Sequence, residues 1–323
     1  MGCRESLYAV VESALGTPKT SPVLNTDAWY FNLPEDDSFS GVTSPEIIEI
    51  PFGGGCAIPF DAFPGRYTTQ LNWKGFVYPT LDNFLLNLAL QRINAGQTVP
   101  WTTTEGPGNL ASASLYKLWE TEDGTIKRKR FAGCKLVSLE MSASAASPAL
   151  RFSATLQSQR EVGNPVDASS DPDATEFPAS TAANLPTRPY VFQDSASEFS
   201  VGGSDVTKYE SLTVRVTNTI DVLHGEARFP QTMRFTGRMV EVTFQKLLMN
   251  SPDFRTPFQS VTDKATLVKF NNGSNSFQIN LGAKCHLTAY TQQLGLSRAF
   301  LETVTIKGRL DGSTGNDVIL TFT

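Results

Sequence analysis

The chain is poor in the residues that build most catalytic centres. Its 323 residues include only two histidines, His224 and His286. Neither lies in an HxxxH or HExxH pattern, and no GxSxG motif occurs. The three glycines at 53–55 are not followed by the Gly-Lys-[Ser/Thr] of a phosphate loop. We therefore expect no enzyme, no catalytic residues, and no bound metal or cofactor. His286 is interpreted as a strand residue and His224 as part of a turn.

The chain also lacks paired cysteines, an excess of positive charge and long apolar runs. Its four cysteines, Cys3, Cys56, Cys134 and Cys285, are far apart, which favours a reduced, cytoplasmic protein. There are 27 Lys and Arg against 32 Asp and Glu, a net charge of −5, which argues against a basic nucleic-acid-binding module. No apolar run approaches about 18 residues, so no membrane-spanning helix is predicted.

Charged clusters are few, and each has an ordinary explanation. An acidic loop holds Asp167, Asp171, Asp173 and Glu176, but it lacks EF-hand spacing and reads as a solvated loop rather than a cation site. The basic run at residues 127–130 would alternate between the two faces of a strand. We expect some of its side chains to meet acidic groups on a partner; the alternative is a nucleic-acid patch.

Two short patterns are also interpreted conservatively. Residues 1–6 fit the myristoylation pattern M-G-x-x-x-[ST], with Cys3 in the palmitoylation position, and are taken as a chance match. The triplet Asn272-Gly273-Ser274 fits a glycosylation acceptor, but Asn-Gly is better explained as hairpin chemistry.

Alternating apolar and polar residues dominate what is present, and they predict a mainly β fold with a few helices. Strands are expected at 44–51, 66–79, 149–159, 211–223 and 234–248, among others, and hairpins at 123–124 and 272–273. The strongest helix pattern covers 79–96, where Leu81, Phe84, Leu85, Leu88 and Ile93 form one apolar stripe that should pack on a sheet. A second, short helix is expected at 246–257.

The same arrangement of elements occurs twice along the chain. FAGCKLVSLEM at 131–141 parallels NLGAKCHLTAYT at 280–291, and Cys134 and Cys285 are separated by nearly half of the chain. Each block follows a strand and an Asx-Gly hairpin and precedes an alternating strand. We infer a duplication and divide the chain into an N-terminal arm (1–43), a first β domain (44–159), a loop or linker (160–188) and a second β domain (189–323). Each domain is expected to be a β-sandwich with a flanking helix.

Several of these stretches resemble the tail tube proteins of long-tailed bacteriophages. VESALGTPKTSP at 11–22 resembles their N-terminal signature, and WKGFVYPTLDNFLLNLAL at 73–90 is similar to their strand–helix unit. KRFAGCKLVSLEM, followed by ALRFSATLQSQ, resembles the strand pair that closes their first sandwich. The second half departs from this pattern, because its helix is shorter and no N-terminal arm is evident.

The resemblance implies a structural subunit of a siphovirus-type tail, with two tandem tail-tube-like domains. Such a two-domain subunit would form trimeric rings with pseudo-sixfold symmetry, stacked into a hollow tube in the virion after assembly in the host bacterial cytoplasm. The implied partners are other copies of the chain, the tape-measure protein, tail-tip or terminator proteins, and phage DNA that passes through without specific binding; no membrane partner is implied. From the residues we expect ring contacts at the sheet edges and inter-ring contacts at 1–43 and 160–188. Negative net charge suits a conduit through which DNA slides.

Three other readings remain open from the sequence alone. The first is a two-domain carbohydrate-binding or adhesin module with an aromatic groove built from Trp29, Trp73, Trp101 or Trp119, although Trp73 and Trp119 are better explained as core residues. The second is a hydrolase with a carboxylate pair, for which no pair stands out. The third is another tube-like tail protein, such as a terminator.

Overall fold

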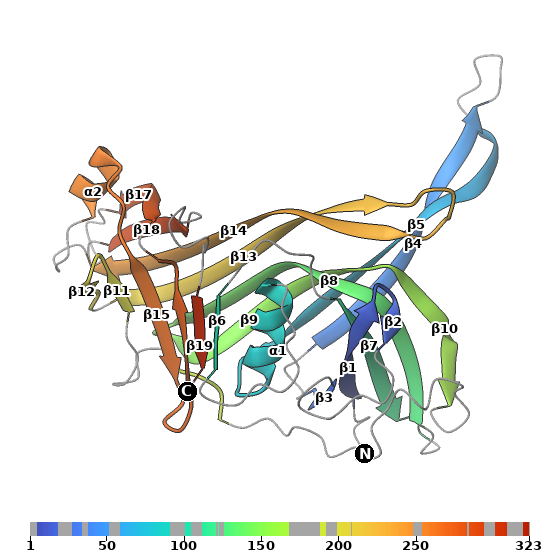
Figure 1. Ribbon diagram of the computed structural model, residues 1–323, viewed down its shortest axis with the longest axis horizontal. Helices are drawn as coiled ribbons and strands as arrows, with labels where there is room; N and C mark the ends of the chain where they lie inside the picture. The colour runs from blue at the N-terminus through green and yellow to red at the C-terminus, as the bar shows by residue number, and fades with distance from the viewer. Residues whose placement is uncertain are drawn as a thin grey trace.

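The computed structural model shows a chain built almost entirely from antiparallel strands (Figure 1). It describes residues 5–18, 28–33, 38–51, 59–90, 101–104, 112–120, 122, 126–167, 188–191, 199–207, 209–247, 254–282, 284–293, 301–308 and 319–322. The predicted mainly β fold is confirmed.

The first half contains ten strands and a helix among its described residues. They are β1 (Glu5–Ala14), β2 (Thr17–Pro18), β3 (Ala28–Asn32), β4 (Ser38–Pro51), β5 (Pro59–Phe76), α1 (Leu81–Leu90), β6 (Trp101–Thr104), β7 (Ala113–Glu120), β8 (Ile126–Ser144), β9 (Ser147–Ser158) and β10 (Arg160–Asp167).

The second half continues with nine described strands and one short helix. They are β11 (Phe199–Val201), β12 (Ser204–Asp205), β13 (Tyr209–Leu223), β14 (Thr232–Leu247), α2 (Arg255–Ser260), β15 (Thr266–Asn271), β16 (Ser276–Asn280), β17 (Cys285–Gln293), β18 (Leu301–Gly308) and β19 (Ile319–Phe322).

One layer of the molecule is a continuous sheet that runs through both halves. Its order is β4-β5-β9-β8-β13-β14-β18-β17, and every neighbouring pair is antiparallel. We call these eight strands the long sheet. The halves join where β8 pairs with β13, from Ser138↔Thr217 to Ser144↔Ser211. This β8–β13 junction is called the internal seam below.

The other strands form a second layer in each half. In the first half, β1 pairs with β2, β3 and β7, β7 pairs with the N-terminal part of β8, and β10 lies on the other side of β8. In the second half the order is β12-β11-β15-β16-β19-β6. Strand β6 belongs to the first half by sequence but pairs with β19, so it links the two halves a second time.

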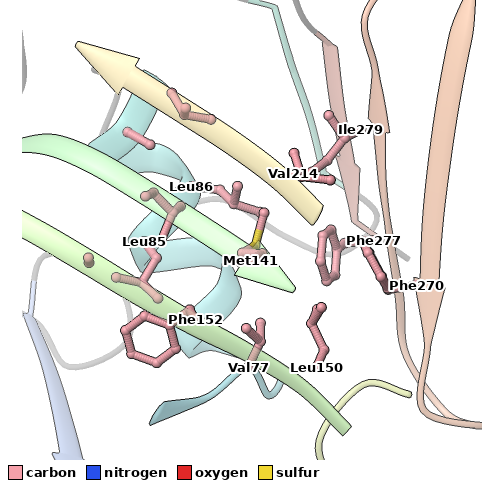
Figure 2. Packing of buried hydrophobic residues seen from close by; sticks show 14 of the residues in the cluster. Val77, Leu85, Leu86, Met141, Leu150, Phe152, Val214, Phe270, Phe277 and Ile279 are labelled. Carbon is pink, nitrogen blue, oxygen red and sulfur yellow. The ribbon is translucent and has the colours of Figure 1, made fainter. Parts of the chain in front are cut away.

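Helix α1 packs under the internal seam, where it contacts both β8 and β13. Its side chains at 84–90 are all buried, including the predicted stripe residues Phe84, Leu85 and Leu88. Figure 2 shows Leu85 and Leu86 of α1 against Met141 and Phe152 of the sheet, with Phe277 and Ile279 of the second half beyond. The prediction that this stripe packs on a sheet is confirmed. Ile93 lies outside the described residues.

Three expectations differ from the structure. Residues 5–14, taken as one short element within an extended arm, form β1, which lies inside the sheet between β3 and β7 and buries Leu7 and Ala9. Residues 160–167, taken as the start of a loop, form β10. The second helix covers only 255–260, because residues 246 and 247 still pair with β18 as part of β14. The physical reason in each case is pairing with a strand distant in sequence, which local periodicity does not reveal.

Candidate functional site

The long sheet ends in two strands that each have one described neighbour. Strand β4 pairs with β5 and strand β17 pairs with β18, and β17 and β4 lie at opposite ends of the strand order (Figure 1). Residues 38–44 of β4 and 288–293 of β17 contain no proline and no charged side chain. Val42 is 62% exposed, and most of the outer half of β17 is exposed as well. Such edges are templates for pairing with another strand.

The other edge strands of the described chain are short or interrupted. Strands β2, β3, β6 and β12 contain five residues or fewer. Strand β10 is longer, but its register with β8 shifts between Val162 and Val166, a stretch that includes Pro165. Bulges and prolines are devices that protect an edge from pairing. The open edges of β4 and β17 are therefore the best candidates for a contact between copies.

The internal seam is a junction in which two strands of the long sheet, one from each half, are fully paired. On the core side, Leu139 lies opposite Val216 and Met141 lies opposite Val214, and all four are buried. Asn218 fixes the end of the seam, because its side-chain amide donates to the carbonyl oxygens of Leu136 (2.9 Å) and Ala89 (3.0 Å). Backbone pairing on top of an apolar core layer stabilises such a junction.

The opposite face of the long sheet is polar and carries one row of alternating charges. The row crosses neighbouring strands through Lys74, Ser153, Glu140, Arg215, Glu241 and Lys307. Arg215 forms a salt bridge with Glu140 across the internal seam, and this interaction raises the pKa of the guanidinium. Rows on either side consist mainly of Ser, Thr, Asn and Gln. The charges on this face are thus largely compensated by their neighbours.

A second cluster joins two motifs that stand far apart in the sequence. The carboxylate of Glu12 accepts hydrogen bonds from the backbone N–H of Gly133 (2.7 Å), the N–H of Gly16 (2.8 Å) and the hydroxyl of Ser114 (2.7 Å). Gly16 and Gly133 both have positive φ, and a Cβ at either position would collide with Gln159. The stretch from Glu12 to Gly16 and the Gly133–Cys134 motif therefore contact each other directly, through the Glu12 carboxylate near the end of β1 and the Gly133 backbone on β8.

We expect Glu12→Gln to lower the free energy of unfolding by about 1–3 kcal/mol. The side-chain NH₂ group of glutamine would face a group that now donates a hydrogen bond to the carboxylate, and two donors cannot pair with each other. Urea unfolding followed by circular dichroism measures the change. Glu140→Gln is the matched control, since its salt bridge is solvent-exposed and its loss should cost less than about 1 kcal/mol. Equal losses for both variants would contradict this role of Glu12.

Both cysteines of the repeated motif are buried and free. The thiol of Cys134 donates to the carbonyl of Phe131 (3.2 Å), and that of Cys285 donates to the carbonyl of Leu281 (3.1 Å). Burial raises the pKa of Cys134 and raises that of Cys285 to about 11. Both thiols stay protonated at neutral pH and act as small packing groups. Cys3 and Cys56 lie outside the described residues, as does the pattern at 1–4.

The histidines occupy structural positions. His286 is on β17 opposite Lys307, and Lys135 is on β8 opposite Gln157, so both residues lie on strands. His224 is buried at the turn between β13 and β14, and its Nε2 is 3.2 Å from the carbonyl oxygen of Tyr67.

The charged clusters are not brought together into one site within the described chain. The basic run lies on β8, as predicted, and Lys129 pairs with Glu161 of the same chain at 2.9 Å. Asp167 ends β10, and Asp171, Asp173 and Glu176 lie outside the described residues. No group of three or more potential metal-binding side chains is found among the residues described.

Two of the four tryptophans are accounted for as core residues. Trp73 is fully buried and Trp29 nearly so, with the Trp29 ring 5.1 Å from that of Phe84. Trp119 is half-buried on β7, and the side chain of Trp101 lies outside the described part. The Asn272-Gly273 turn is confirmed: the side-chain Oδ1 of Asn272 accepts hydrogen bonds from the backbone N–H groups of Ser274 and Asn275.

The comparisons with known proteins agree with this picture of a β-structural protein whose open features are sheet edges. The family model of the phage tail tube protein matches residues 2–323, and the chain belongs to that family. It is a structural subunit of a phage tail tube, and membership implies self-assembly into a tube. A search of curated proteins gave no match. Among the described residues, no helix is long and apolar enough to cross a membrane.

Proposed function

We propose that the chain is the subunit of a ring that closes by pairing β17 of one copy with β4 of the next. Stacked rings would form the hollow tail channel of a siphovirus-type virion. The observation that carries this proposal is the internal seam, because the chain already contains one junction of the required kind.

Support comes first from the repetition of the sheet. The order β4-β5-β9-β8 in the first half has the same connections as β13-β14-β18-β17 in the second. The register of β8 on β9 shifts between Leu136 and Ser138, and that of β17 on β18 shifts between Leu287 and Ala289, the matching position. We propose that the chain contains two copies of one unit. Three chains would then supply the six units of a ring with pseudo-sixfold symmetry.

In this arrangement, β17 is the equivalent of β8, and β4 is the equivalent of β13. The junction between copies then has a register that can be written down from the internal seam. Glu140↔Arg215 translates into Thr291 opposite Val42 of the next copy, and Leu139↔Val216 translates into Tyr290 opposite Thr43. Both strands are antiparallel in the internal seam, so the new pair would be antiparallel too.

We further propose that the polar face of the long sheet lines the channel. In the described part of the chain, the opposite face is covered by α1 and the core, which leaves the polar face to meet DNA. Its row of charges alternates in sign from Glu140 through Arg215 and Glu241 to Lys307. A hydroxyl-rich wall with compensated charges offers phosphates no continuous basic track, and DNA could slide along it without strong binding.

The hairpin of β4 and β5 is the proposed contact between stacked rings. It projects beyond the body of the molecule in Figure 1, and Ile47 and Ile48 are exposed on it. Exposed apolar side chains on a projecting hairpin fit a surface that becomes covered on assembly. Residues 5–14 cannot serve as a free inter-ring arm, because they pair within the sheet as β1. The tape-measure protein and tail-tip or terminator proteins remain the proposed further partners, with assembly in the host bacterial cytoplasm.

Electron microscopy of the concentrated protein tests the ring proposal. We expect rings or tubes about 10 nm wide whose end views show threefold or pseudo-sixfold symmetry. A protein that stays monomeric at all concentrations, with or without tail initiator proteins, would contradict it. Glycan binding by such a monomer would instead support the adhesin alternative, although the burial of Trp29 and Trp73 speaks against the groove expected for it.

A further inference from the structure

We propose that the junction between copies is specified by two polar networks, a buried one that ends at Tyr290 on β17 and a half-buried one that ends at Thr43 on β4. The inference rests on the proposed ring and its register, and it names the side chains that select the correct partner edge. It follows from a difference between the two ends of the long sheet and the internal seam.

The network behind β17 is built on a buried ion pair. Lys246 Nζ lies 2.9 Å from a carboxylate oxygen of Glu302, and their side chains are 0% and 3% exposed. The hydroxyl of Tyr290 donates to the other oxygen of Glu302 at 3.0 Å, and the side-chain amide of Gln292 lies within hydrogen-bond distance of that hydroxyl. Lys246 also stands 5.0 Å from the ring centre of Phe254. The chain of contacts thus leads from the core to the open edge.

The network behind β4 has the same chemical plan. Lys129 Nζ lies 2.9 Å from one oxygen of Glu161, and the hydroxyl of Thr43 donates to the other oxygen at 3.0 Å. Thr43 is also within 3.0 Å of the hydroxyl of Thr69 on β5. Here too a lysine, a glutamate and an edge hydroxyl follow one another outward.

At the internal seam, the equivalent positions are apolar. Tyr290 corresponds to Leu139, and Thr43 corresponds to Val216. Leu139 and Val216 lie opposite each other and are both buried in the core. Behind them, the positions equivalent to Glu302 and Lys246 are Phe152 and Gly75. On the core-facing side of the four edges compared, the chain therefore places carboxylate networks only at the two edges that it leaves open.

A physical reason explains this distribution. The internal seam forms once, during folding, and never needs to meet water afterwards. The edges at Tyr290 and Thr43 must remain soluble in the free subunit and still pair on assembly, which hydroxyl groups backed by fixed carboxylates allow. A polar edge placed against an apolar one would lose the hydration of its hydroxyl and carboxylate groups without gaining a hydrogen bond, so each edge disfavours the wrong partner.

A double-mutant cycle on assembly tests the proposal. Tyr290→Phe and Thr43→Val are made singly and together in the full chain, and the critical concentration for ring formation is measured by light scattering. The two residues lie at opposite ends of one subunit's sheet, so they cannot touch in the monomer. Tyr30→Phe, which removes the hydroxyl that contacts Ser6 on β1, replaces Tyr290→Phe in the control cycle.

We expect the double variant to depart from the product of the single effects by at least about threefold in critical concentration, while monomer melting remains additive. The control cycle should be additive in both measurements. Additive assembly effects for Tyr290 and Thr43 would overturn the proposal, even if rings form. Failure of the unmodified chain to form rings would instead count against the proposed function itself.

Discussion

Placing a lysine on each open edge, with Val42→Lys and Thr291→Lys in one chain, should leave a folded monomer that does not form rings. Both side chains are exposed in the free subunit, so the fold should tolerate the change. In the proposed register the two lysines face each other across every junction, and like charges directly opposite one another destabilise strand pairing. We expect the critical concentration for assembly to rise by at least about tenfold, because each ring contains several such junctions. Sedimentation velocity measures the loss of rings.

The complementary variant supplies the control for register. Val42→Arg with Thr291→Glu would copy the Arg215–Glu140 pair of the internal seam into the junction between copies. Assembly should recover to at least the level of the unmodified protein, and high salt should weaken the effect. If the two double variants behaved alike, strands β4 and β17 would not meet in this register.

A second large effect is expected in the core. Trp73→Ala should lower the free energy of unfolding by about 3–5 kcal/mol, since it empties the centre of the first half. The indole is fully buried and its ring lies between 5.3 and 6.3 Å from those of Phe31, Phe39, Phe84 and Phe152. Chemical denaturation of the monomer provides the measurement.

Trp73→Phe is the matched control, because it retains an aromatic ring in contact with the same neighbours and should lose markedly less stability. A Trp73→Ala variant with unchanged stability but impaired ligand binding would contradict the structure and favour the carbohydrate-binding alternative. The contact of Trp73 with α1 through Phe84 also means that this variant should loosen the helix under the internal seam.

Local patterns in the sequence predict those parts of the fold that depend on local chemistry. The stripe of α1 follows from helical spacing, and the turn at Asn272 follows from Asn-Gly, which supplies both the side-chain acceptor and a positive φ at Gly273. That His286 lies on a strand could be predicted because it stands in a stretch of alternating apolar and polar residues. In each case the signal lies within a few residues of the feature.

The features that define the assembly interface depend on pairing between distant segments and could not be predicted in the same way. The sequence predicts a short element near residues 6–15, but it does not predict that β1 lies between β3 and β7. That β4 and β17 are open edges, while β8 and β13 are paired, is a property of the whole sheet order. The role of Glu12 could have been suspected from its place beside the Gly16 turn, but its contact with Gly133 spans more than a hundred residues.

Cross-linking through the proposed junction tests the central claim most directly. Val42→Cys and Thr291→Cys are introduced into a chain with Cys3→Ser and Cys56→Ser, since Cys134 and Cys285 are buried. Directly opposite residues of antiparallel strands have Cα atoms about 4.5–5.5 Å apart, within the range of a disulfide. After assembly and mild oxidation, denaturing electrophoresis should show dimers and trimers and no larger species. A ladder that continues past the trimer, or the absence of cross-links in assembled tubes, would contradict a three-chain ring closed by β4 and β17.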